Sequence, residues 1–162
     1  MDKKLHKAMD EQIKNELYSA YLYLSMAAYC ESENLPGFSH WLKVQAKEET
    51  THAMKIFEFL NDRGARVTLQ AIPQPPIDFS SPKDIFEKAL DHEKKVTAMI
   101  NNLYAVAADV KDTATGVFLH WFINEQVEEE KQAALILETI KMVHGDSGAA
   151  LIMLDRELAK RE

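Results

Sequence analysis

The sequence of 162 residues has few of the residues that interrupt helices: only five glycines and five prolines. This scarcity favours long, unbroken helices over a turn-rich β fold. The single cysteine, Cys30, allows neither a disulfide framework nor a cysteine-based metal cluster, which fits a reducing compartment. No apolar run approaches the ~20 residues of a membrane span, and the charged first residues, MDKKLHKAMDEQ, contain no apolar signal core. We therefore expect a cytoplasmic protein that does not contact membranes.

Positive charge is also in short supply. The chain has 19 Lys and Arg against 26 Asp and Glu, for a net charge of −7. This balance argues against nucleic acid as a partner and favours cations. Hydrophobic residues make up 46% and charged residues 28%, which is ordinary for a globular protein. The length suits one domain, residues 1–162, with a sizeable core.

The few helix breakers divide the chain into five helical segments. Pro36 fits the first turn of a helix, with Asn34 as a candidate cap nearby, and Gly64 fits a helix end. Ser81 and Pro82 match an N-cap followed by a first-turn proline. The predicted helices cover about 2–32, 36–62, 82–109, 113–144 and 148–160, with an extended crossover over 64–81. Four long helices joined by short, long and short links predict an all-α four-helix bundle with one long crossover loop and a short fifth C-terminal helix.

Each long helix carries polar residues near the middle of an otherwise apolar seam. A bundle helix buries positions spaced alternately three and four residues apart. On that template the inward polar residues are Glu16 in the first helix, Glu49 and His52 in the second, Glu93 in the third, and Gln126 and Glu129 in the fourth. The spacing 16, 49, 52 recurs as 93, 126, 129 with a constant offset of 77, so the two hairpins resemble copies of one unit. At ~1.5 Å per helical residue, this six-residue set lies at one level of the bundle.

Four buried carboxylates at one level need a balancing positive charge. Each would cost several kcal/mol if left unpaired, and the seams carry no Lys or Arg at that level. Either the carboxyl groups stay protonated with raised pKa values, or cations lie between them, and the second arrangement costs less. Oxygen ligands with a single imidazole suit iron or manganese better than copper. Two Glu residues with paired i, i+3 ligands are the arrangement of di-iron carboxylate bundles.

Three more glutamates lie one residue away from this set. We call Glu48, Glu125 and Glu128 the outer acidic set. They either line a further, wetter metal position that shares Glu129 or form a solvated face. Glu130 is expected to be solvated.

The six-residue set resembles the ferroxidase centre of the ferritins; its members are Glu16, Glu49, His52, Glu93, Gln126 and Glu129. The outer acidic set resembles the third iron site of prokaryotic non-haem ferritins. The resemblance covers essentially the whole chain. It implies a ferritin-like fold and a hollow homo-oligomeric shell of 24 subunits, which oxidises Fe²⁺ with O₂ or H₂O₂ and stores hydrated ferric oxide. It assigns Glu16, Glu49 and His52 to one iron, with Glu49 bridging. It assigns Glu93, Gln126 and Glu129 to the second iron, and it matches Tyr23 to a tyrosine near the centre.

Two positions depart from the related bacterioferritins, which have Glu-x-x-His in both halves. Here the second half reads Gln126-x-x-Glu129, and a neutral amide without an imidazole should bind the second iron more weakly. The methionine that binds haem in bacterioferritins is replaced by Thr50, so no haem is expected, and Met54 is expected in the core. The acidic residues that line the threefold channel of animal ferritins are not evident near Gly116 at the start of the fourth helix.

Several alternatives stay open from the sequence. A di-iron peroxidase of the rubrerythrin type, without a rubredoxin module, is the second reading of the function. Tyr23 and Trp121 are either core aromatics or redox-active. The last helix either closes the core of its own domain or sits at a subunit junction, and the resemblance favours the junction. Surface or hydrogen-bonded positions are expected for the remaining histidines, which are His6, His40, His92, His120 and His144.

Overall fold

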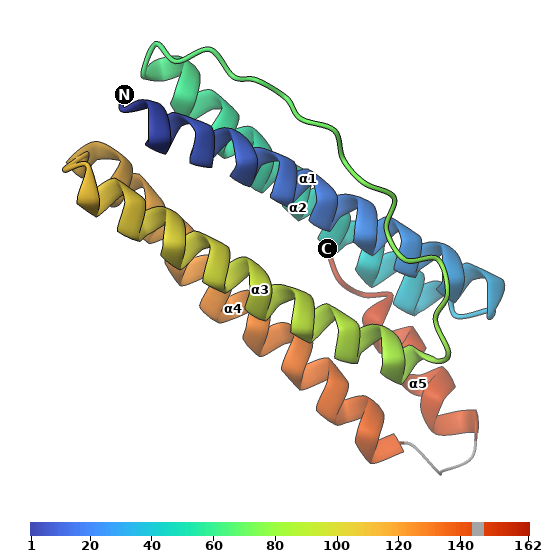
Figure 1. Cartoon of the computed structure of the whole chain (residues 1–162). Coiled ribbons are helices and arrows are strands. Elements are labelled where there is room, and N and C mark those ends of the chain that lie inside the picture. Colours follow the sequence, from blue (N-terminus) through green and yellow to red (C-terminus); the bar gives the residue numbers. More distant parts are fainter. Residues whose placement is uncertain (144–147) are drawn as a thin grey trace.

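The computed structural model describes residues 1–143 and 148–162, and those residues form five helices and no strand. The helices are α1 (Lys3–Ser32), α2 (Pro36–Asp62), α3 (Pro82–Asp109), α4 (Thr113–Val143) and α5 (Gly148–Leu158). The predicted all-α bundle with a short fifth helix is confirmed (Figure 1). The last helix ends two residues earlier than predicted. His144 and the predicted turn after it, up to Ser147, lie outside the described residues.

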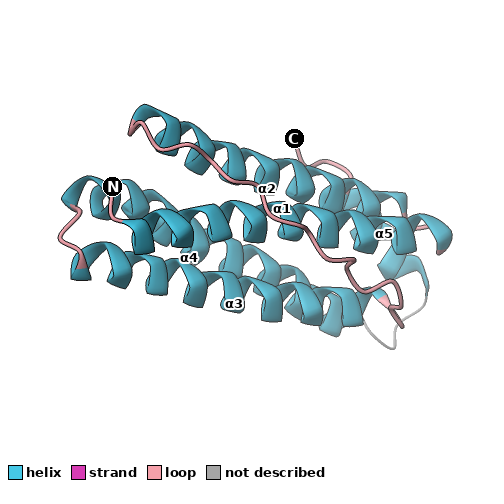
Figure 2. Cartoon of the chain, turned by 45° about the horizontal axis from the view of Figure 1, so that its top comes forward, coloured by secondary structure: helices cyan, strands magenta, loops and turns pink. Residues whose placement is uncertain are grey.

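The long crossover runs along the length of the bundle from the end of α2 to the start of α3, as Figures 1 and 2 show. Hydrogen bonds hold it against α1. The Ser25 hydroxyl donates to the carbonyl of Pro76 at 2.6 Å, and the backbone N–H of Thr68 donates to Asp10 Oδ1 at 3.2 Å. The crossover therefore lets α3 start at the opposite end of the bundle from the end of α2, so that α3 runs parallel to α2.

Most of the predicted helix ends are found. The Ser81 hydroxyl accepts from the N–H of Asp84 at 3.1 Å, and Gly64 takes the left-handed conformation at φ +67° after α2. The prediction for Asn34 was wrong, because it adopts φ 58° and terminates α1 instead of capping α2. The N-cap of α2 is Leu35, which has no polar side chain to offer.

The missing cap of α2 is supplied by α5. Asp155 Oδ1 accepts from the backbone N–H groups of Gly37 at 2.8 Å and Phe38 at 2.9 Å. A Cβ atom on residue 37 would lie 1.7 Å from the carbonyl oxygen of Asp155, so only glycine permits this contact. A carboxylate at a helix N-terminus satisfies free donors and interacts favourably with the helix dipole. The position of α5 is thereby fixed against the start of α2.

The apolar core forms two clusters, one on each side of the polar level. One contains Tyr23, Phe38 and Phe86, and the other contains Met9, Ile56, Leu60, Leu119 and Phe122. One core prediction was wrong: Met54 is 44% exposed. The buried positions around it on α2 are His52, Ala53 and Ile56, so Met54 lies on the opposite, solvent-facing side of the helix.

The fifth helix closes the core of its own domain with one face. Leu158 is buried and Leu151 and Leu154 pack against the core, whereas Ile152 and Met153 are exposed by 53% and 71%. The exposed face remains available for a subunit junction. In the parts of the chain that the structure describes, no helix combines the length and apolarity that crossing a membrane requires.

Candidate metal centre

The six-residue set converges from all four long helices, as the seam pattern predicted. Each member is buried, with exposed fractions between 1% and 5%. Ligand atoms of Glu16, Glu49 and His52 lie within 4.8 Å of one another, and so do those of Glu49, Glu93 and Glu129. Glu49 belongs to both groups, so the two groups are neighbours that share one carboxylate.

The first group presents a carboxylate oxygen without a protein partner. Gln12 Nε2 donates to Glu16 Oε1 at 2.8 Å, but Glu16 Oε2 has no hydrogen-bond partner among the described residues. His52 Nδ1 lies 3.7 Å from Glu49 Oε2. Buried oxygens are nearly always paired, so an unpaired carboxylate oxygen facing an imidazole nitrogen and a second carboxylate suits a bound cation.

The second group is held by neutral donors. Tyr23 donates its hydroxyl hydrogen to Glu93 Oε1, and Gln126 Nε2 donates to Glu93 Oε2 at 3.1 Å. Tyr23 is 1% exposed, so its ring fills the core while its hydroxyl contacts a ligand of the candidate site. Each donor removes one lone pair from the carboxylate and fixes its orientation, which prepares the remaining lone pairs for a metal ion.

Two glutamines with a role at the site were not assigned one from the sequence. Gln45 Nε2 donates to Glu49 Oε1 at 3.0 Å and to Glu129 Oε2 at 2.6 Å, and Gln12 contacts Glu16 in the same way. Both glutamines lie four residues before a seam glutamate, a spacing that places two side chains on one helix face. That repeated Gln-x-x-x-Glu pattern is the signal that could have identified them.

Burial and the neighbouring negative charges raise the pKa values of the buried glutamates. Burial, together with the neighbouring charge of Glu49, raises the pKa of Glu16 to about 8. Burial, with Glu49 and Glu93 adding to it, raises the pKa of Glu129 to about 8 as well. Burial also raises the pKa values of Glu49 and Glu93. In the metal-free protein Glu16 and Glu129 therefore hold protons near neutral pH, and a bound cation would replace those protons.

The outer acidic set is only partly assembled. Glu125 Oε1 lies 3.9 Å from His52 Nε2, and Glu125, His52 and Glu129 form a third group of ligand atoms within 4.8 Å. Glu48 and Glu128 join none of the groups formed by the described residues, and Glu48 pairs instead with Arg161. Glu130 was expected to be solvated, but it is half-buried and accepts from the Thr97 hydroxyl at 2.5 Å.

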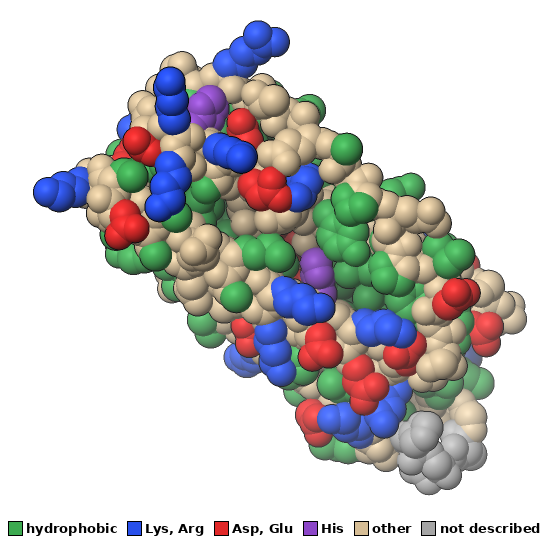
Figure 3. All heavy atoms as spheres, in the orientation of Figure 1, with side chains coloured by type: hydrophobic (Ala, Val, Ile, Leu, Met, Phe, Trp, Pro, Cys, Tyr) green, Lys and Arg blue, Asp and Glu red, His purple; other side chains and the backbone are tan. Residues whose placement is uncertain are grey.

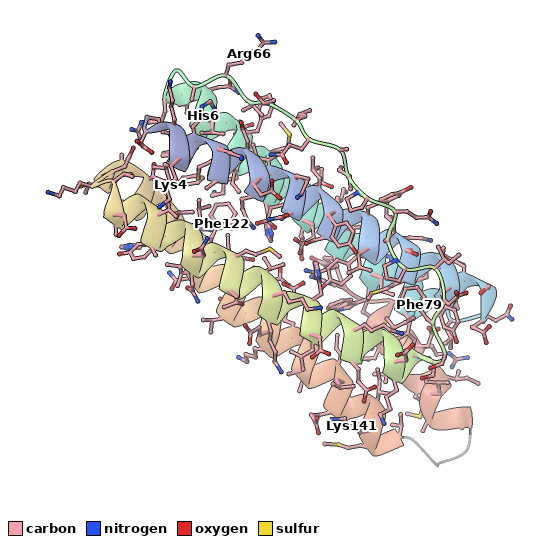
Figure 4. All side chains as sticks on the ribbon, viewed as in Figure 1. Lys4, His6, Arg66, Phe79, Phe122 and Lys141 are labelled. Atoms are coloured by element: carbon pink, nitrogen blue, oxygen red, sulfur yellow. The ribbon has the colours of Figure 1, made fainter. Side chains whose placement is uncertain are left out.

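Aromatic rings cover the histidine of the site. The rings of Trp121 and Phe122 pack edge-on against His52 at centroid distances of 5.3 Å and 6.3 Å. Figure 4 shows Phe122 between the two hairpins. Trp121 is not a core aromatic, since it is 37% exposed and carries Lys55 Nζ 4.4 Å above its ring. Trp121 thus separates His52 from solvent.

Three of the remaining histidines make hydrogen bonds, as expected. His92 Nε2 lies 2.8 Å from the Ser19 hydroxyl, His6 Nε2 lies 3.1 Å from the carbonyl of Arg66, and His40 Nε2 lies 2.7 Å from the carbonyl of Arg161. Burial lowers the pKa of His92 to about 4. None of these histidines joins the groups of ligand atoms found in the described parts of the chain.

A family model for the ferritin-like domain matches residues 6–143. The chain belongs to the ferritin family. This ferritin-family chain is 40% identical over 161 residues to a bacterial non-heme ferritin of Staphylococcus aureus, covering 99% of this chain and 96% of the relative. A bacterial non-heme ferritin of Staphylococcus saprophyticus is also 40% identical over 161 residues, with the same coverage of both chains.

Solved ferritin structures match the whole fold. The open-pore ferritin of the archaeon Archaeoglobus fulgidus aligns with a TM-score of 0.98 and 46% identity, over 100% of this chain and 98% of that one. A humanized archaeal ferritin aligns with a TM-score of 0.97 and 46% identity, with the same coverage. Membership of the ferritin family supports a role in iron storage, and the carboxylate and histidine groups described above could hold metal.

Proposed function

We propose that this ferritin-family protein stores iron and acts as a ferroxidase, oxidising Fe²⁺ to Fe³⁺ at a di-iron centre inside each subunit. The observation that carries the proposal is the pair of buried ligand groups that share Glu49. One carboxylate between two groups can bridge two ions and keep them close enough to react together. The resemblance to ferroxidase centres, set out from the sequence, agrees with this geometry.

In the proposed reaction, Fe²⁺ is the substrate and two ions bind before electron transfer. Glu16, Glu49 and His52 would hold one ion, and Glu93 and Glu129 with Gln126 nearby would hold the other beside the shared Glu49. Each ion gives up one electron. The two electrons and two protons reduce O₂ to H₂O₂, or reduce H₂O₂ to two molecules of water. The carboxylates stabilise the higher charge of the Fe³⁺ that forms.

The second position is built to release its ion. Gln126 contributes no charge, and its amide nitrogen donates to Glu93. A neutral amide in place of a histidine or carboxylate lowers the attraction for Fe³⁺. We infer that this position passes iron on instead of keeping it as a permanent cofactor, and that Glu125, Glu48 and Glu128 provide the next position.

Iron storage requires a shell, and the surface of the subunit carries apolar residues suited to association. The exposed side chains of Tyr21, Leu24, Ile72 and Ile77 gather where the crossover lies on α1, and hydrophobic side chains are visible on this face in Figure 3. Together with the exposed face of α5, they support self-association. The assembly proposed here is a homo-oligomer of 24 subunits in the cytoplasm, with iron and no haem.

Loading with iron tests this proposal directly. Fe²⁺ is added in air to the purified protein, and the mixture is separated by size while iron and protein are measured in each fraction. We expect iron, in large excess over subunits, to elute with protein in a particle of about 24 subunits. A monomer or dimer that consumes H₂O₂ but retains no iron would support the rubrerythrin-type peroxidase instead.

A further inference from the structure

The chain segment after α5 lies against α2 and ends beside the middle of the bundle, where Figure 1 marks the C-terminus. It carries Arg161, whose side chain is only 14% exposed. The preceding residue, Lys160, is exposed by 69% at its side chain and pairs with Glu157 at 2.5 Å. The two adjacent basic side chains are therefore in very different environments: Lys160 is exposed and Arg161 is largely buried.

Arg161 is fixed from several directions. Its Nη2 atom lies 2.5 Å from Glu48 Oε2, and its Nη1 atom donates to the carbonyl of Trp41 at 3.3 Å. The guanidinium carbon lies 4.2 Å from the centroid of the Trp41 ring, a cation–π contact. His40 contacts the backbone carbonyl of Arg161 at 2.7 Å. These contacts leave the guanidinium one orientation, with Glu48 as its acidic partner.

The docking of α5 on α2 determines the position of Arg161 beside Glu48. Asp155 anchors α5 to the first backbone N–H groups of α2, and Leu158 enters the core. Three residues later, the chain has advanced along α2 to the level of Trp41 and Glu48. The ion pair thus depends on the docking of α5, which itself requires the glycine at position 37.

Glu48 is the member of the outer acidic set that Arg161 holds. It precedes Glu49, the carboxylate shared by the two buried groups. An arginine side chain stays charged at any pH the protein tolerates and has a geometry suited to carboxylates. A metal ion that uses Glu48 as a ligand must therefore displace a guanidinium from the same carboxylate, and Glu128 offers no such competing partner among the described salt bridges.

We infer that Arg161 is a positioning residue that acts through Glu48 and weakens metal binding at the outer acidic set. This inference rests on the proposed di-iron function, because it assigns the third position of the iron path to that set. By occupying Glu48, the guanidinium keeps iron from settling at the outer position. The ion that leaves the buried pair then moves on toward the mineral.

The test is an anaerobic titration with Fe²⁺, followed by calorimetry, on the wild-type protein and on Arg161→Gln. We expect the first two Fe²⁺ ions per subunit to bind equally well in both. The third ion should bind about two- to fivefold more tightly in Arg161→Gln, the range for release of a half-exposed ion pair. Arg161→Lys, which keeps the positive charge, should restore most of the wild-type affinity.

Lys160→Gln is the matched control, since it removes the same charge one residue away without touching Glu48. An equal gain in that variant would show a general charge effect and overturn the inference. Unchanged binding of the third ion in Arg161→Gln would also overturn the inference. The same holds if Arg161→Gln still tightens third-ion binding when it is added to Glu48→Gln, where the guanidinium has no Glu48 carboxylate to occupy. If the wild-type protein binds no Fe²⁺ tightly, the proposed function is refuted, and the role of Arg161 with it. If it binds two ions but Arg161→Gln leaves the third unchanged, only the role of Arg161 is refuted.

Discussion

Replacing Glu49 and His52 together by alanine should reduce the initial rate of aerobic Fe²⁺ oxidation by on the order of 100-fold, to near the rate in protein-free buffer. The change removes the carboxylate shared by both buried groups and the one imidazole of the first group. Two Fe²⁺ ions then have no common ligand to hold them together. The measurement is the appearance of Fe³⁺ absorbance after mixing Fe²⁺ with protein in air-saturated buffer.

The double variant should remain folded, because neither of the two apolar core clusters contains Glu49 or His52. A matched control is Glu58→Ala plus His120→Ala, which removes the same two residue types from exposed positions on α2 and α4. That control should oxidise Fe²⁺ at the wild-type rate. Equal initial rates for the wild type and for Glu49→Ala plus His52→Ala would reject the assignment of the centre.

The metal-free protein should lose stability as the pH rises from about 4.5 to about 8. The carboxyl groups of Glu16 and Glu129 have an ordinary pKa of 4.5, and burial raises both to about 8 in the folded chain. Between those values the unfolded chain has released protons that the folded chain still holds, so the free energy of unfolding decreases with pH. The slope is about 1.4 kcal/mol per pH unit for each such group. Thermal unfolding in the presence of a chelator measures it.

Bound metal should remove this pH dependence, because the metal-bound folded chain and the unfolded chain then both hold these carboxyl groups ionised. A cation binds the ionised carboxylates, so it competes with protons and binds more tightly as the pH rises. With Zn²⁺, which has no redox chemistry, the unfolding temperature should therefore stay nearly constant over the same pH range. Glu16→Gln plus Glu129→Gln should flatten the pH dependence of the metal-free protein. A metal-free protein that becomes more stable between pH 4.5 and 8 would contradict the raised pKa values.

The sequence was sufficient to predict the fold and the convergence of the inner residues because both depend on local periodicity. Ser81 and Gly64 mark helix ends through their own chemistry, and seam spacing brought Glu49 and Glu93 to one level. Polar residues on the apolar seams are easy to recognise because few glycines and prolines interrupt the helices. Charge balance then gave the hypothesis of bound cations.

The features that the sequence did not predict depend on contacts between distant segments. Asp155 caps α2 from a position 118 residues away. The residues around the N-cap Leu35 do not indicate that the cap comes from a distant helix. The pairing of Arg161 with Glu48 depends on that same docking. Glu130 was misjudged because its partner, Thr97, lies on another helix. Such pairings follow from tertiary packing, which a helical period does not contain.

The most direct test of the central claim is to soak crystals in Fe²⁺ without oxygen and locate the iron by anomalous scattering. We expect two strong peaks per subunit, one among Glu16, Glu49 and His52 and one among Glu49, Glu93 and Glu129. Strong peaks only on the surface, with the interior carboxyl groups hydrogen-bonded to one another as neutral acids, would contradict it.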